Sequence, residues 1–228
     1  MILYLAAALA ALAPTANAAP AGRCPDLVTA EAFVCRAMEA QRSQKPADAA
    51  AAFDQAAAQT EPKDGAQARL FAAAGNMWIA ADQPGKAALA LDRALALPGL
   101  VAEQRGEALL DRARAAEAQG DLRTARARLN DAANLIAADP FYWYFSAALA
   151  IREENKTAAQ AAITRALALA PADPTILFEA GHVAHFTGDI VGARDYWTRA
   201  AERDPRGTAG TAAKEALRML PAPLTVKN

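Results

Sequence analysis

The only histidines of this 228-residue chain are His182 and His185, and their three-residue spacing places them on one face of a helix. Glu179 lies one turn earlier on that face, so three side chains that can bind a metal come together. The pattern supplies no fourth ligand, and Phe178 and Phe186 lie beside the histidines. We therefore expect histidines that line a binding surface, with no metal and no cofactor. A small-ligand or metal carrier built on this group is the least favoured alternative.

The sequence contains no motif of a common enzyme class. It has no G-x-S-x-G nucleophile elbow, no glycine-rich phosphate loop and no Cys/His set with structural-zinc spacing. We therefore expect a protein that binds without catalysing a reaction.

Charge gives little reason to expect a nucleic-acid partner. The net charge of −1 creates no general field that would attract nucleic acid or an anionic membrane. Five arginines are clustered in one part of the chain and interleaved with aspartate and glutamate. They are Arg112, Arg114, Arg123, Arg126 and Arg128. This pattern predicts a solvated surface with ion pairs rather than a nucleic-acid patch.

Residues 1–18 have the composition of a secretory signal peptide. The apolar run Ile2–Ala13 is too short to span a bilayer, Pro14 breaks it, and an A-x-A cleavage site ends at Ala18. No Lys or Arg precedes the run, so either the α-amino group supplies the charge or the true start lies upstream. We expect a periplasmic or secreted protein, cleaved near Ala18, without a stable membrane anchor. The alternative is a cytoplasmic chain with a hydrophobic N-terminal helix.

Cys24 and Cys35 are the only cysteines, and an even pair in an exported protein predicts a disulfide. The bond would tie the proline-containing leader to the first helix. The alternative is a buried Cys35 and an exposed Cys24 thiol. Their spacing is not C-x-x-C, so no redox motif is indicated.

The rest of the chain repeats a unit of two short helices joined by a turn. In residues 174–205 the turn falls at Thr187-Gly188-Asp189, and Pro205 ends the second helix. The apolar faces of the two helices are expected to contain Ile176, Leu177, Ala180, Gly181 and Ala184, and then Ile190, Ala193, Trp197 and Ala200. So small a unit cannot bury these faces alone and needs neighbours.

The same pattern recurs 34 residues upstream, in residues 140–171, with Trp143 in the place of Leu177. Further copies begin near Gly106 and Ala68, and a weaker one begins near Ala30. The copies near Ala68 and Gly106 are 38 residues apart because about four residues are inserted around residues 98–101.

A 34-residue period of helix–turn–helix units resembles the tetratricopeptide repeat (TPR) family, here as an exported bacterial member. The resemblance covers about residues 30–207. It implies an all-α, right-handed solenoid of about five helical hairpins. We expect residues 19–29 to be irregular, residues 208–220 to form a capping helix and residues 221–228 to be a disordered tail. Asp139 and Asp173 each precede a proline and are predicted to cap first helices.

In TPR proteins the first helices line a concave groove that holds an extended peptide or a partner helix. Transferred by register, the resemblance implies a protein-binding groove lined by Arg69, Asn76, Leu110, Arg114, Phe141, Tyr144, Arg152, Phe178, His182 and His185.

Residues 141–145 are five consecutive aromatics, which cannot all face one side of a helix. With Trp143 in the core, we expect Phe141 and Tyr144 to be partly exposed as binding anchors. The alternative is that the run only fills space.

The sequence thus favours a non-enzymatic protein- or peptide-binding adaptor or scaffold, in an envelope assembly. It does not identify the partner. The alternative is a structural module that self-associates through the aromatic run.

Overall fold

The computed structural model describes residues 24–63 and 65–221, and within these ranges it contains eleven helices and no strand. The helices are α1 (Ala30–Arg42), α2 (Pro46–Ala58), α3 (Ala66–Ala80), α4 (Pro84–Ala96), α5 (Ala102–Ala118), α6 (Leu122–Ala132), α7 (Pro140–Arg152), α8 (Lys156–Leu169), α9 (Pro174–Thr187), α10 (Ile190–Arg203) and α11 (Thr208–Met219). None of these helices is long and apolar enough to cross a membrane. The predicted signal peptide and nearly all of the predicted tail lie outside the described residues.

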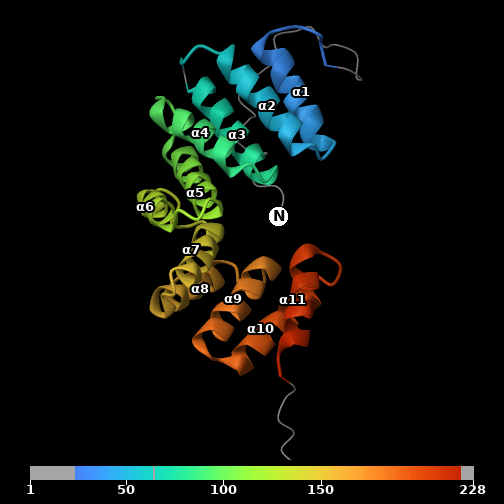
Figure 1. Ribbon diagram of the computed structural model, residues 1–228, viewed down its shortest axis with the longest axis vertical. Coiled ribbons are helices and arrows are strands. Elements are labelled where there is room, and N and C mark those ends of the chain that lie inside the picture. Colours follow the sequence, from blue (N-terminus) through green and yellow to red (C-terminus); the bar gives the residue numbers. More distant parts are fainter. Residues whose placement is uncertain (1–23, 64, 222–228) are drawn as a thin grey trace, which may run out of the picture.

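The helices pair into five consecutive hairpins that stack into an arc, with α11 at the end (Figure 1). The first helices α3, α5, α7 and α9 contact one another in turn, whereas no comparable contact joins α4 to α6, α6 to α8 or α8 to α10 in the described chain. The inner side of a curved stack is the shorter one, so the first helices form the concave side. The all-α solenoid expected from the sequence is confirmed.

The turn inside each hairpin contains one residue with a positive φ angle. These residues are Gln44, Asp82, Gly120, Glu154 and Gly188. The last three follow each other at 34 residues, and the first three at 38. The turns therefore confirm the 34-residue period and the insertion between the copies near Ala68 and Gly106.

Small residues let the two helices of a hairpin approach closely. Gly181 of α9 lies against the indole of Trp197 on α10, and the indole Nε1 donates a hydrogen bond to the Phe178 carbonyl at 3.0 Å. In the α3–α4 hairpin, the equivalent glycine, Gly75 of α3, packs against the side chain of Leu91 on α4. The predicted core residues Ala193, Trp197 and Ala200 are all buried.

Two expected core positions are wrong. Ile190 is exposed because it begins α10, and side chains in the first turn point back beyond the end of the helix. Trp143 is only half-buried. Tyr142, Phe145 and Leu149 form the buried stripe of α7 instead, at spacings of three and four residues. Trp143 lies at the border of this stripe and donates from Nε1 to the Ala137 carbonyl at 2.8 Å.

Aspartates fix the starts of the inner helices α7 and α9. The Asp139 carboxylate accepts a hydrogen bond from the Phe141 amide, and the Asp173 carboxylate accepts from the amides of Thr175 and Ile176. A proline follows each aspartate at the first helical position, where its missing N–H leaves no partner unsatisfied. Both predicted caps are present.

The two ends of the solenoid are closed differently. At the N-terminal end, Cys24 and Cys35 form a disulfide, and the Arg36 guanidinium donates to the carbonyls of Pro25 and Leu27. At the C-terminal end, α11 packs on α9 and α10 and buries Ala213. Helix α11 thereby covers apolar surface that a next hairpin would otherwise cover.

The Gly181–Trp197 contact gives a test of this packing. A Cβ atom at residue 181 would overlap with Nε1 and Cδ1 of the indole. Gly181→Ala should therefore lower the free energy of unfolding by about 1–3 kcal/mol, although alanine is the better helix former. The measurement is urea denaturation followed by circular dichroism.

Gly85→Ala in α4 is the matched control, because nothing lies within 4 Å of a Cβ atom built there. It should leave the stability unchanged or raise it by up to about 1 kcal/mol. A Gly181→Ala variant as stable as the Gly85→Ala variant would contradict the close contact.

Candidate peptide-binding groove

The inner face, defined as the side chains of α3, α5, α7 and α9 on the concave side, is held by polar contacts between repeats. Asp111 of α5 is buried, and its carboxylate accepts hydrogen bonds from Asn76 Nδ2 on α3 at 2.7 Å and from Arg114 Nη1 at 2.8 Å. The carboxylate thus fixes two of the predicted groove side chains. Sequence reasoning did not give Asp111 this role.

Arg114 continues the network to the next repeat. Its guanidinium carbon lies 5.5 Å from the centre of the Phe141 ring, and that ring stacks on Tyr144 with their centres 5.1 Å apart. Both aromatic side chains are partly buried and partly exposed. Polar and aromatic contacts therefore join Asn76, Arg114, Phe141 and Tyr144 into one group, which spans three inner helices.

Tyr144 connects this group to α9. Burial, and then the negative charge of Glu179, raise the pKa of the Tyr144 phenol to about 12. The charges of Glu117 and Asp173 act in the same direction, and Arg114 opposes them. The phenol is therefore neutral at physiological pH and lies in a negative environment.

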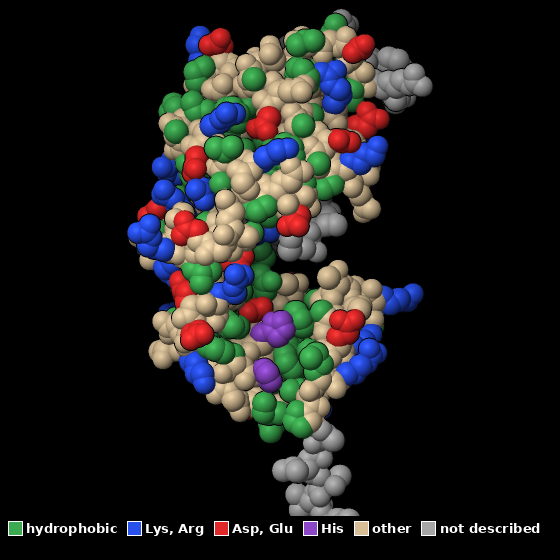
Figure 2. All heavy atoms as spheres, in the orientation of Figure 1, with side chains coloured by type: hydrophobic (Ala, Val, Ile, Leu, Met, Phe, Trp, Pro, Cys, Tyr) green, Lys and Arg blue, Asp and Glu red, His purple; other side chains and the backbone are tan. Residues whose placement is uncertain are grey.

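The last inner helix has a second group of rings. Phe178 and His182 lie 4.3 Å apart between ring centres, and Trp197 of α10 lies 5.6 Å from His182 and 5.9 Å from His185. Figure 2 shows the two histidines on one face of the molecule, next to a group of hydrophobic side chains. The predicted residues Phe178, His182 and His185 are thus brought together.

Two neighbouring residues at the end of α7 bind the preceding hairpin. Arg152 is ion-paired with Glu117 of α5, and Glu153 accepts hydrogen bonds from Nε and Nη2 of Arg126 on α6. Because Arg152 is paired at the edge of the inner face, it contributes to the joint between hairpins as well as to the surface.

The two remaining predicted groove residues are Leu110 and Arg69, and they differ in burial. Leu110 is 4% exposed and packs in the core of the α5–α6 hairpin, so its place in the groove is wrong. The repeat register assigned it to the inner surface, but α5 buries both Leu109 and Leu110. Arg69 is partly exposed near the start of α3.

Several acidic side chains lie near one another where α5 and α7 begin. Burial, followed by the charges of Glu103, Asp111 and Asp139, raises the pKa of Glu107. Burial also raises the pKa of Asp139, against the hydrogen bond from the Phe141 amide. These carboxylates therefore lie close enough for their charges to interact.

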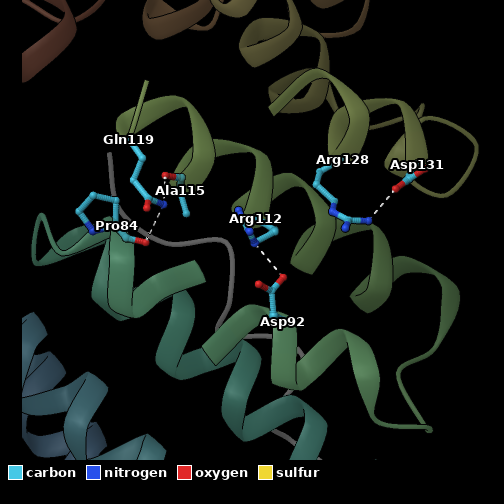
Figure 3. Close-up of polar contacts among 7 residues, drawn as sticks. All are labelled: Pro84, Asp92, Arg112, Ala115, Gln119, Arg128 and Asp131. Carbon is cyan, nitrogen blue, oxygen red and sulfur yellow. Dashed lines mark hydrogen bonds and ion pairs between the residues drawn. The ribbon is translucent and has the colours of Figure 1, made fainter. Parts of the chain in front are cut away.

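The arginine cluster is neutralised by ion pairs. Arg112 Nε lies 2.8 Å from an Asp92 oxygen, and Arg128 Nη1 lies 3.1 Å from an Asp131 oxygen (Figure 3). Gln119 Nε2 adds a hydrogen bond across the same α4–α5 interface, to the Pro84 carbonyl at 3.4 Å. With Arg114 and Arg126 also paired, four of the five arginines form ion pairs, as the sequence predicted for this cluster, although Asp92 and Glu153 lie outside it.

Within residues 24–63 and 65–221, no group of three or more His, Cys, Asp or Glu side chains is placed to hold a metal ion. Glu179 and His182 do approach, with 3.5 Å between Oε2 and Nδ1.

Known proteins give matches in structure but not in sequence. No family model matches the chain, and no curated protein matches it. The crystal structure of PilW, described as a widely conserved type IV pilus biogenesis factor, is 17% identical, with a TM-score of 0.66 over 81% of this chain and 82% of that one.

Two further structures are similar. PilF of Pseudomonas aeruginosa has a TM-score of 0.64 at 16% identity, over 84% of this chain and 83% of that one. YrrB, described as a TPR protein with an unusual peptide-binding site, has a TM-score of 0.56 at 16% identity, over 82% of this chain and 92% of that one. At these identities the likeness concerns the fold. From its five hairpins, its period of turns and these neighbours, the chain has the fold of the tetratricopeptide repeat proteins.

Proposed function

We propose that the protein is a non-enzymatic adaptor or scaffold that binds an extended peptide or a partner helix on its inner face. The observation that carries the proposal is the partly exposed aromatic surface of Phe141, Tyr144 and Phe178. Ring contacts within α7 and α9 hold these side chains, and Arg114 of the preceding repeat packs on Phe141. Aromatic side chains that are fixed before binding lose little conformational entropy on binding and are typical anchors. The similarity to YrrB, a protein described as having a peptide-binding site, supports this use of the fold.

Self-association through the aromatic run has less support. Tyr142 and Phe145 are buried, Trp143 is hydrogen-bonded to Ala137, and Phe141 stacks on Tyr144. The two buried rings, Tyr142 and Phe145, are therefore not available to a second copy. Among the described residues, the most exposed large hydrophobics lie elsewhere, at Met219 and Val191.

Site-specific photo-crosslinking tests the proposed surface. A photoreactive phenylalanine analogue at Phe178, on the inner helix α9, should give crosslinked partners in the native cell. The same analogue at Val191, which is exposed at the start of the outer helix α10, should give few. Mass spectrometry of the adducts identifies the partner. Adducts from Val191 alone would contradict binding on the inner face, and adducts between two copies of the chain would favour self-association.

We further propose that the protein works in the bacterial envelope after removal of residues 1–18. Disulfides persist in oxidising compartments such as the periplasm, and the Cys24–Cys35 bond suits that location. Two of the similar structures are PilW, a pilus biogenesis factor, and PilF, which fits an envelope role.

Cell fractionation followed by intact-mass analysis tests the location. The expected species is a periplasmic chain that begins at Ala19 and whose two cysteines resist alkylation until a reductant is added. A cytoplasmic, full-length chain with two reactive thiols would contradict the proposal.

A further inference from the structure

Three charged or polar side chains are classed as buried in the described structure, and all three belong to inner helices. They are Asp111 of α5, Ser146 of α7 and Glu179 of α9. Asp111 and Glu179 are 68 residues apart, which is two repeats, so they occupy the same position of the repeat. Their surroundings nevertheless differ.

Asp111 is fully compensated by its own neighbours. One carboxylate oxygen accepts from Asn76 and the other from the guanidinium of Arg114, at 2.7 and 2.8 Å. A buried carboxylate with a cation and a second donor is the arrangement that folded proteins normally require. Asp111 therefore has a structural role, which the chain itself completes.

Glu179 lacks such compensation. Its side chain is 7% exposed, and among the described residues the one basic side chain within 4.0 Å of its carboxylate is His182, at 3.5 Å from Nδ1. A histidine carries no permanent charge, so it is a weaker counter-charge for a buried carboxylate than an arginine is. The position that holds Arg114 three residues after Asp111 holds His182 three residues after Glu179. The fixed cation is therefore missing here.

The surroundings of Glu179 suit an incoming cation. Tyr144 lies close enough for the charge of Glu179 to raise the pKa of its phenol, and this effect exceeds the opposing effect of Arg114. Phe178 and His182 lie one turn apart on α9 with their rings in contact, and the His182 side chain beside the carboxylate is 41% exposed. Aromatic rings around a carboxylate attract ammonium and guanidinium groups by cation–π and charge interactions.

We propose that Glu179 forms a subsite of the inner face for a Lys or Arg side chain of the bound peptide, with Tyr144, Phe178 and His182 as its walls. This inference rests on the proposed function and specifies the partner: an extended segment with a basic residue at this position. The carboxylates Glu103, Glu107 and Asp139, whose charges interact where α5 and α7 begin, add negative charge that favours the same partner.

Peptide mixtures test the subsite. Octapeptide mixtures, with one central residue fixed as Arg, Lys, norleucine or Glu and the others varied, are measured against the purified protein by fluorescence anisotropy. The buffer is at pH 8, where imidazoles are ordinarily neutral. The Arg- and Lys-fixed mixtures should bind at least about tenfold more tightly than the norleucine-fixed mixture, a typical gain from a desolvated charge pair. In Glu179→Gln this preference should disappear.

Glu202→Gln is the matched control, because it removes the same charge from an exposed position on the outer helix α10. It should retain the preference. Tyr144→Leu should weaken the preference without abolishing binding, since it removes a ring and keeps the carboxylate.

Other outcomes would overturn the inference. Binding without a basic preference would leave the proposed function standing and remove the subsite. A basic preference that survives Glu179→Gln would place recognition at other carboxylates. N-acetyl-arginine amide binding as tightly as the Arg-fixed peptides would indicate a small-molecule site instead. If no mixture binds, both the subsite and the proposed function are contradicted.

Thermal stability gives a readout that does not depend on any ligand. Replacing an uncompensated buried carboxylate by the isosteric amide removes a desolvation cost, so the Tm of Glu179→Gln should equal or exceed that of the unaltered protein. A marked fall in Tm would show that Glu179 pairs with His182 in the free protein and would overturn the proposal.

Discussion

The structure depends on one constraint: no hairpin can bury its apolar face without its neighbours. The interiors of the hairpins are made largely of alanine, with glycine at the closest approaches, such as Gly181 against Trp197. Small side chains bring helices close together but bury little area each, so stability has to come from stacking along the whole arc. Helix α11 covers the last hairpin of the stack, and the disulfide ties the N-terminal segment to α1 at the other end.

The same constraint creates the inner face. Because the stack curves, the first helices of successive repeats touch, and side chains 35 residues apart, such as Asn76 and Asp111, bond directly. Each such bond joins repeats and also fixes a side chain of the proposed binding surface. Asp111 and Glu179 show two uses of one repeat position: the first is balanced inside the protein, and the second leaves a negative charge for a ligand.

The architecture could be predicted from the sequence because the repeat imposes it. Each hairpin can be predicted from patterns within its own sequence, and the structure contains all of them. They are the 34-residue period of turns, the buried alanines and the Asp-Pro caps. Groove residues were harder to predict because a rotation of about 100°, the step from one residue to the next in a helix, decides exposure. Leu110 and Trp143 differ from the expected orientation for this reason. The Asp111 network depends on contacts between repeats, although the two-repeat spacing of Asp111 and Glu179 was a visible signal.

The central claim is that ligands bind to the first helices of the hairpins and not to the second. Hydrogen exchange measured by mass spectrometry, with and without the tightest-binding octapeptide mixture, tests it most directly. The account predicts slower exchange in α5, α7 and α9 on binding, with little change in α4, α6 and α10. Protection confined to the second helices, or to α11 and the N-terminal disulfide segment, would contradict it.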